Sequence, residues 1–182
     1  MQTASDYLQK NDGKRALAAI SPVLAQHPDN PMALNIKGAI LTKQKDYDGA
    51  QACYEAALRA SPGLFAARYN LGDLLVRRQQ VEAATDYIRT LLREQPDNEL
   101  LQYKLLLLLL RRDADPQLQA RLFPSEIPSG TAAWYYARAA RAYRKGQAGE
   151  ASRYLEVARS VFGDQTAIFQ EELDESGLKK SR

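Results

Sequence analysis

The chain has 182 residues, of which 45% are hydrophobic and 26% are charged, and its formal net charge is +3. This composition is typical of a soluble globular protein, and so small a charge does not by itself indicate a nucleic-acid partner. The longest apolar run, residues 105–110, is far shorter than the roughly 20 residues of a membrane-spanning helix. We therefore expect a soluble chain without membrane insertion. Its compartment stays open: cytoplasmic, or periplasmic or otherwise extracytoplasmic if a signal peptide was removed.

A repeated pattern organises residues 31–98. Residues 31–64 and 65–98 carry the same residue types about 34 positions apart. The matching pairs are Gly38 and Gly72, Leu41 and Leu75, Ala50 and Ala84, and Pro62 and Pro96. The glycines and alanines allow two helices to approach closely, and each proline ends the second helix.

This period of paired helices resembles the tetratricopeptide repeat (TPR). The resemblance implies an all-α fold, a right-handed superhelical α-solenoid of antiparallel helix pairs. Residues 1–30 fit the same frame but lack the first turn of their first helix. We therefore expect a truncated first unit, in a chain that is a fragment of a longer protein.

The fourth unit, residues 99–130, is degenerate because Leu106 replaces the glycine. Its second helix is predicted to begin at Pro116, after the N-cap Asp115, and to stop near Leu122. A helix of half the usual length leaves room for the larger leucine.

Residues 131–163 restore the pattern, with Ala139 at the glycine position and Gly146 at the turn. Residues 164–177 are predicted to form a capping helix, because the last repeat helix would otherwise leave an apolar face in water. We expect the whole of residues 1–182 to form a single TPR-like domain.

Catalytic residues are not apparent. His27 is the only histidine and is expected in a solvated turn, and Cys53, the only cysteine, is expected to be buried. One His and one Cys cannot supply a zinc site or a Cys/His pair, and no glycine-rich phosphate loop occurs. We expect no enzyme, no metal and no cofactor.

The resemblance implies that the first helices of the pairs line a concave groove that contacts ligands. A tyrosine recurs at the fifth position of three units and a basic residue at the thirteenth position of four. The predicted groove residues are Tyr69, Asn70, Asp73, Arg77, Tyr103, Lys104, Leu107, Leu110, Arg111, Tyr136, Tyr143 and Arg144, and Lys43 is the fourth basic residue. Rigid aromatic rings and fixed cations suit a protein segment with carboxylates, so an acidic partner is favoured.

Two other interpretations stay open for these columns. A cation at the end of a helix is stabilised by the helix dipole without any ligand, and a tyrosine can pack against the neighbouring helix. The carboxylate clamp that grips chaperone tails is disfavoured, because only Asn70 and Lys104 match its pattern.

Leu100, Leu107 and Leu110 are predicted to form an apolar strip in the groove that needs a cover. The candidates are a partner segment, the 122–130 loop or a second copy of the chain. The acidic stretch 171–175 could dock against the basic column, but we favour a solvated face for it.

The leading function is a protein–protein interaction scaffold that binds an extended peptide or helix of a partner in the concave groove. The alternatives are a self-associating assembly module and the non-catalytic TPR part of a longer multidomain protein. Nucleic-acid binding ranks last, because the basic residues are interleaved with 22 acidic ones.

Overall fold

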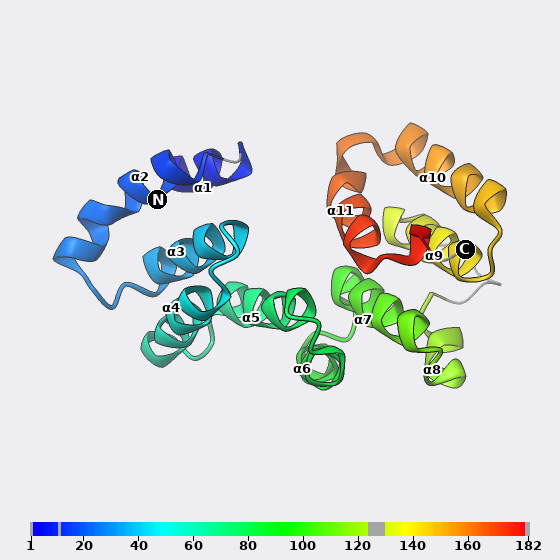
Figure 1. The fold of residues 1–182 in the computed structure, drawn as a ribbon, viewed down its shortest axis with the longest axis horizontal. Coiled ribbons are helices and arrows are strands. Elements are labelled where there is room, and N and C mark those ends of the chain that lie inside the picture. Colours follow the sequence, from blue (N-terminus) through cyan, green and yellow to red (C-terminus); the bar gives the residue numbers. More distant parts are fainter. Residues whose placement is uncertain (1, 11, 124–129, 181–182) are drawn as a thin grey trace. The chain divides into compact units, whose positions relative to one another are not determined.

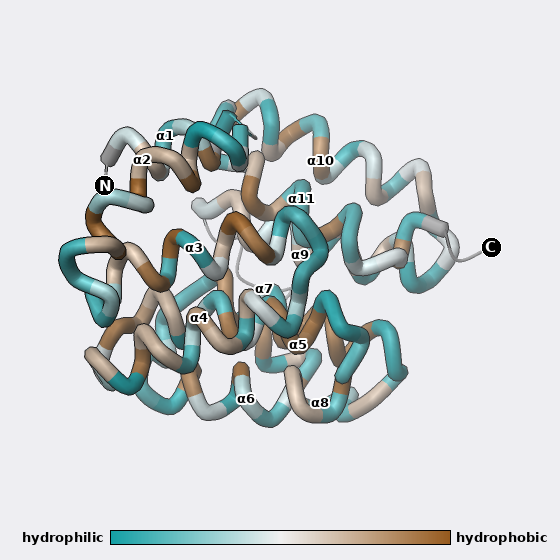
Figure 2. Tube along the Cα trace, turned by 60° about the vertical axis from the view of Figure 1, so that its left-hand side comes forward, coloured by the Kyte–Doolittle hydropathy of each residue, from teal (hydrophilic) through white to brown (hydrophobic). Residues whose placement is uncertain are grey.

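The computed structural model describes residues 2–10, 12–123 and 130–180, and the elements within these ranges are helices that follow one another in pairs (Figure 1). Along most of the helices hydrophobic and hydrophilic residues alternate (Figure 2), as expected for helices that bury one face. The chain divides into two compact units, the N-terminal unit Met1–Ala84 and the C-terminal unit Thr85–Arg182. The single domain over residues 1–182 stays a prediction.

The N-terminal unit contains two complete helix pairs and the first helix of a third. Its helices are α1 (Gln2–Gln9), α2 (Gly13–Gln26), α3 (Pro31–Lys43), α4 (Tyr47–Ala60) and α5 (Phe65–Arg77), and α6 (Val81–Glu94) runs across the division between the units. The side chains of Asp12, Asn30 and Asp46 cap α2, α3 and α4, each accepting a backbone N–H at 3.0 Å. As predicted, α4 stops just before Pro62.

The pair α3–α4 packs as the repeat pattern predicts. Gly38 of α3 faces Tyr54 of α4 so closely that a Cβ atom on the glycine would lie 2.5 Å from a ring carbon. The Thr42 hydroxyl donates to the Gly38 carbonyl at 3.0 Å and lies 2.9 Å from the Tyr54 hydroxyl, which therefore donates to it. Tyr54 fills the space beside the glycine and is only 1% exposed.

The C-terminal unit contains a long helix, a short helix, a complete pair and a final helix. These are α7 (Glu99–Arg112), α8 (Pro116–Arg121), α9 (Ala132–Arg144), α10 (Ala148–Phe162) and α11 (Ala167–Ser176), with 3₁₀ turns η1 (Gly163–Thr166) and η2 (Leu178–Lys180). The predicted cap of α8 is present, since Asp115 accepts the Leu118 N–H at 3.0 Å. Arg141 of α9 holds the end of α8 by donating to the Gln119 carbonyl at 2.6 Å and to the Phe123 carbonyl at 3.1 Å.

Helix α7 is buried on nearly every face. From residue 103 to residue 110 every side chain is buried, including that of Lys104. Both α9 and α11 pack against α7, whereas α8, with only six residues, makes a smaller contact. A helix that is apolar all round must be covered on several sides, and here helices from beyond its own pair supply the cover.

The predicted C-terminal helix is present as α11, and its main partners are α7 and α9. Figure 1 shows it in red, turning back after α10. On the last repeat helix, α10, Val157 stays 40% and Val161 64% exposed. The reason we gave for a capping helix, cover for the last repeat helix, therefore does not hold at these two valines.

Candidate protein-binding surface

The predicted groove residues of the N-terminal unit lie on α5 and are half-buried. Asn70 donates its amide N–H to the Asn35 amide oxygen of α3 at 2.9 Å, and Arg77 Nε contacts the Asp73 carboxylate at 2.7 Å. The Tyr69 ring lies 6.4 Å from the Phe65 ring one turn earlier. These side chains form a polar row along α5 that is tied to α3.

The first basic residues of the predicted column bond within the chain. Lys43 Nζ donates to the Leu8 carbonyl in the last turn of α1 at 2.9 Å, and Arg77 pairs with Asp73. Lys43 lies in the last turn of its own helix, α3, as the helix-dipole interpretation requires, and its bond goes to the carbonyl end of α1. In this unit the cations therefore have a structural role without any ligand.

In the C-terminal unit, α7, α9 and α11 bring three aromatic rings together. The Phe169 centroid of α11 lies 5.6 Å from that of Tyr103 and 5.9 Å from that of Tyr136, and the two tyrosine rings are 6.3 Å apart. Both tyrosines are fully buried. Tilted and edge-on rings at these distances attract one another beyond their buried area.

Lys104 and Glu172 form a buried ion pair beside these rings. Their Nζ and Oε1 atoms are 2.5 Å apart, and the side chains are 3% and 12% exposed. The favoured solvated face for residues 171–175 is therefore wrong at Glu172, although Glu171, Asp174 and Glu175 are exposed. The stretch does dock in cis, but through Glu172 on Lys104 and not on a residue of the basic column.

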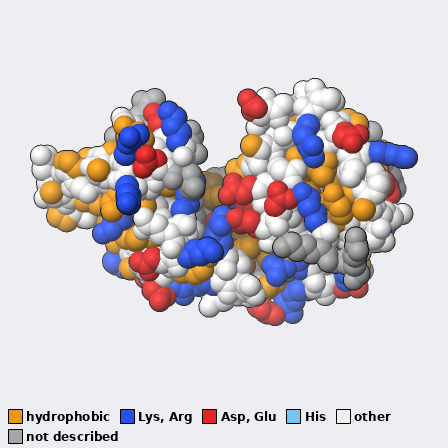
Figure 3. All heavy atoms as spheres, turned by 45° about the horizontal axis from the view of Figure 1, so that its top comes forward, with side chains coloured by type: hydrophobic (Ala, Val, Ile, Leu, Met, Phe, Trp, Pro, Cys, Tyr) orange, Lys and Arg blue, Asp and Glu red, His pale blue; other side chains and the backbone are white. Residues whose placement is uncertain are grey.

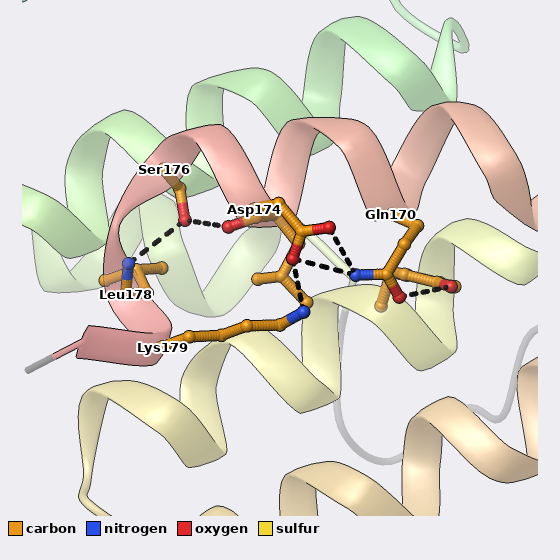
Figure 4. A network of polar contacts seen from close by, with 7 residues as sticks. Gln170, Asp174, Ser176, Leu178 and Lys179 are labelled. Atoms are coloured by element: carbon orange, nitrogen blue, oxygen red, sulfur yellow. Dashed lines mark hydrogen bonds and ion pairs between the residues drawn. The ribbon is translucent and has the colours of Figure 1, made fainter.

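Polar contacts fix the position of α11 (Figure 4). The Tyr136 hydroxyl donates to Gln170 Oε1 at 3.1 Å, and Gln170 Nε2 donates to the Asp174 carboxylate at 3.0 Å. Lys179 pairs with the same carboxylate, and the Leu178 N–H donates to Ser176 Oγ at 3.2 Å. Although partial burial alone would raise the pKa of Asp174, hydrogen bonds from Lys179 and Gln170 hold it below its usual value.

The Tyr103 hydroxyl is buried and has no hydrogen-bond partner among the residues that the structure describes. Burial raises the pKa of this phenol well above 10, and the nearby Glu172 carboxylate raises it further. A buried hydroxyl without a partner is rare in folded proteins and costs about 1–3 kcal/mol. The contact of α11 with α7 therefore leaves one polar atom unsatisfied.

The remaining predicted residues lie toward the C-terminal ends of α7 and α9. Leu107 and Leu110 are each 4% exposed, Tyr143 is half-buried, and Arg111 and Arg144 are exposed. An open pocket of about 240 Å³ lies between both arginines and the end of α11, lined by Leu110, Arg111, Arg144, Ser176, Gly177 and Leu178. Arg144 also lies 3.7 Å from the Asp113 carboxylate. The pocket thus offers two guanidinium groups to a carboxylate.

Of the three candidate covers for the leucine strip, the 122–130 loop falls mostly on residues outside those described. Leu107 and Leu110 are buried and Leu100 is half-buried, and the helices that pack against α7 are α9 and α11. Sequence reasoning did not name α11 for this role. Its signal was present in the apolar pattern of Phe169 and Leu173 with Glu172 between them, opposite a helix that carries a lysine.

The reactive residue types occupy structural positions. Cys53 is buried, and burial raises the pKa of its thiol. His27 ends α2 and is exposed. Among the described residues, His, Cys, Asp and Glu nowhere gather in a group of three that could hold a metal ion.

Comparison with known proteins decides the family. A family model described as a tetratricopeptide repeat matches residues 1–63, and a second with the same description matches residues 41–108. Together they cover more than half of the chain. The chain is a tetratricopeptide repeat protein. Repeats of this family bind peptides or proteins and are generally non-catalytic scaffolds.

Solved structures agree with this TPR assignment. A TPR protein from Parabacteroides merdae has a TM-score of 0.72 at 19% identity, over 95% of this chain and 68% of that one. YrrB, a TPR protein with an unusual peptide-binding site, has a TM-score of 0.57 at 20% identity, over 93% of this chain and 88% of that one. At these identities the likeness establishes the fold alone. No curated protein is significantly similar in sequence.

One similar structure is that of an enzyme. A mutant O-GlcNAc transferase from Thermobaculum terrenum has a TM-score of 0.60 at 27% identity over 67% of this chain. The match spans only 24% of the transferase chain. It is therefore a likeness to one part of that enzyme.

Two surface observations complete the description of the TPR protein. None of the helices in the described ranges is long and apolar enough to cross a membrane. On the face drawn in Figure 3, acidic and basic side chains are interspersed.

Proposed function

We propose that this TPR protein binds a segment of a partner protein, as an extended peptide or a helix, on the first helices of its pairs. The observation that carries the proposal is the packing of α11 against α7 and α9. Residues predicted for the groove from the sequence, Tyr103, Lys104 and Tyr136, contact a helix there. A surface that packs a helix through aromatic rings and a buried ion pair has the chemistry for binding a similar segment in trans.

The charges favour an acidic partner segment. Arg111 and Arg144 are exposed beside the open pocket at the end of α11. Guanidinium groups bind carboxylates in a two-pronged geometry, which gives direction as well as affinity. The two arginines suit acidic side chains that follow the segment seated on α7 and α9.

The polar row of the N-terminal unit supports a second contact area. Asn70 is half-buried and donates one amide N–H to Asn35, which leaves its second N–H and its amide oxygen for the backbone of an extended peptide. The peptide-binding site described for the structural relative YrrB agrees with a binding role in general terms.

The test uses charge reversal at the two exposed arginines. Proteins captured by the wild-type chain are identified and produced separately, and their dissociation constants are measured by titration. The Arg111→Glu/Arg144→Glu variant is expected to bind its partner at least about tenfold more weakly, since two charge-assisted contacts become repulsive.

The matched control reverses two exposed arginines on α6 and α10, Arg93 and Arg153, with the same change in net charge. It should bind like wild type, and both variants should unfold as wild type does. Equal affinities for both variants would contradict the proposed surface.

One observation favours self-association as a second candidate function. Val157 and Val161 lie one turn apart on α10 and are exposed to solvent. Apolar side chains on a terminal repeat helix suit another copy of the chain. Light scattering over a wide concentration range tests this: a mass that rises with concentration and returns to the monomer value in Val157→Lys/Val161→Lys supports it, and a constant monomer mass ends it.

A further inference from the structure

We infer that the surface of α7 and α9 takes an amphipathic partner helix with an aromatic residue, a carboxylate three positions later and a leucine four positions later, and that α11 competes for it. This inference rests on the proposed function and names the chemistry of the bound segment. It also adds a step, because the partner must displace the chain's own helix.

The required pattern follows from the three side chains by which α11 is seated. Phe169 joins the rings of Tyr103 and Tyr136, Glu172 pairs with Lys104, and Leu173 is fully buried. Residues three and four positions apart lie on one face of a helix. A partner helix with the same three groups at the same spacing therefore presents the same face.

Lys104 favours a carboxylate at the Glu172 position. It is 3% exposed, and a buried ammonium group without a counter-charge is strongly unfavourable. A helix with a neutral or basic residue at the Glu172 position would remove the carboxylate that lies 2.5 Å from this ammonium group. The buried lysine thus selects acidic helices and rejects basic ones.

The Tyr103 hydroxyl can favour a partner helix over α11. With α11 in place this buried group has no partner among the described residues, although its ring is in contact with Phe169. A partner helix with a hydrogen-bond acceptor at this point satisfies the hydroxyl and gains over α11. The chain's own helix is therefore an incomplete fit to the surface it occupies.

Helix α11 is also built to separate from the surface. It has 10 residues and lies between Gly163, with φ of +53°, and Gly177, with φ of +75°. A helix of this length is marginal alone, so its helical state depends on docking. Its release leaves the packing of α9 against α10 intact, because those two helices contact each other directly.

The probe for the test is a fluorescent peptide with the sequence of residues 164–178, titrated into full-length chains. In wild type, α11 competes at an effective concentration on the order of millimolar, so binding is weak. Glu172→Lys sets a lysine against Lys104 and releases α11, and is expected to bind the probe at least about tenfold more tightly. Glu156→Lys, the same change at an exposed site on α10, should behave as wild type.

Charge exchange identifies the contact. The Lys104→Glu chain should lose the probe and instead bind a version with lysine in place of Glu172. Equal binding of both peptides by this chain would overturn the inference, since the buried charge would then not select the helix.

Hydrogen exchange of wild type with saturating probe follows the displacement and does not depend on a variant. Loss of amide protection in residues 167–176 alone supports displacement, and unchanged protection there overturns it. A Glu172→Lys chain that doubles its mass as concentration rises, with α11 protected, overturns the partner helix in favour of exchange between copies. A natural partner that binds while α11 stays protected overturns this inference and leaves the proposed function standing.

Discussion

In the N-terminal unit, polar groups on the first helices bond to one another and those on α5 stay half-buried, whereas in the C-terminal unit α11 packs on the first helices. Asn35 with Asn70 and Asp73 with Arg77 are pairs within the repeats themselves. The counterpart in the C-terminal unit, Lys104, pairs with Glu172 of α11. The polar groups of α3 and α5 pair with one another, whereas α7 pairs with the added helix α11.

The cause lies in one repeat position. Gly38 lets α3 and α4 pack so closely that Tyr54 fills the space beside it, so that pair buries its own apolar faces. Leu106 occupies the corresponding position of α7, whose partner α8 has only six residues. Loss of the small residue moves the burial of α7 from its own pair to helices outside it.

The largest expected effect tests how much the C-terminal unit depends on this cover. Lys104→Glu sets two carboxylates against each other in a buried site and should lower the free energy of unfolding by about 3–5 kcal/mol. Urea denaturation measures the loss. Hydrogen exchange should show the lost protection in residues 85–180, with residues 2–84 unaffected.

The control replaces the whole pair. Lys104→Met/Glu172→Leu should recover most of the loss, because well-packed apolar residues of similar size often replace a buried ion pair at little cost. Equal loss of protection in both units after Lys104→Glu would contradict the comparison, and the two units would then behave as the single domain predicted from the sequence.

The repeat pattern of the sequence was enough to predict the helix pairs, the end of α4 before Pro62, the cap at Asp115 and the shortness of α8. Each follows from local chemistry: a proline, a carboxylate at a helix start, or a small residue at a fixed spacing. Helix α2 runs through Pro22, a feature on which the repeat pattern makes no prediction.

The place of Tyr103, Lys104 and Tyr136 in the repeat predicts them for the groove, and their binding role stays a prediction. The sequence did not predict that a helix of the same chain contacts them. That they are covered by Phe169 and Glu172 depends on a contact between segments 68 residues apart, from Lys104 to Glu172, which no local pattern encodes. From its sequence, an acidic amphipathic helix is equally compatible with a solvated face and with docking on a basic groove. Only the tertiary fold, which places Lys104 beside Glu172, decides between the two.

The next prediction tests close packing in the N-terminal unit. Gly38→Ala puts a methyl group 2.5 Å from a ring carbon of Tyr54, so the ring must move, at a cost of about 1–3 kcal/mol. Gly149→Ala, on α10, is the matched control because nothing lies within 4 Å of the added atom. The control should leave stability unchanged or raise it by less than about 1 kcal/mol. Equal effects of both changes in urea denaturation would show that the glycine position does not control the packing.

The smallest expected effect compares one buried tyrosine from each unit. Tyr54→Phe removes a hydroxyl that donates to Thr42 and should cost about 0.5–1.5 kcal/mol at neutral pH. Tyr103→Phe removes a hydroxyl without a partner and should be neutral or stabilising. Urea denaturation of both variants checks the difference, and a larger loss for Tyr103→Phe would mean that the α11 contact satisfies its hydroxyl after all.

The pH dependence of the same pair separates hydrogen bonding from burial. Burial raises the pKa of Tyr54 to about 12, whereas the pKa of a tyrosine in the unfolded chain is about 10. Because the folded pKa is the higher one, the stabilisation is complete below about pH 10 and is lost as the pH rises from about 10 to 12. Between about pH 8 and pH 11, wild type should therefore lose about 1–1.5 kcal/mol more stability than Tyr54→Phe.

Tyr103→Phe should also reduce the loss of stability at alkaline pH, because burial raises the pKa of Tyr103 as well. At neutral pH the same change removes no hydrogen bond within the described residues. A Tyr103→Phe profile that follows wild type through this range would mean that the ring meets water when α11 leaves, before the unit unfolds.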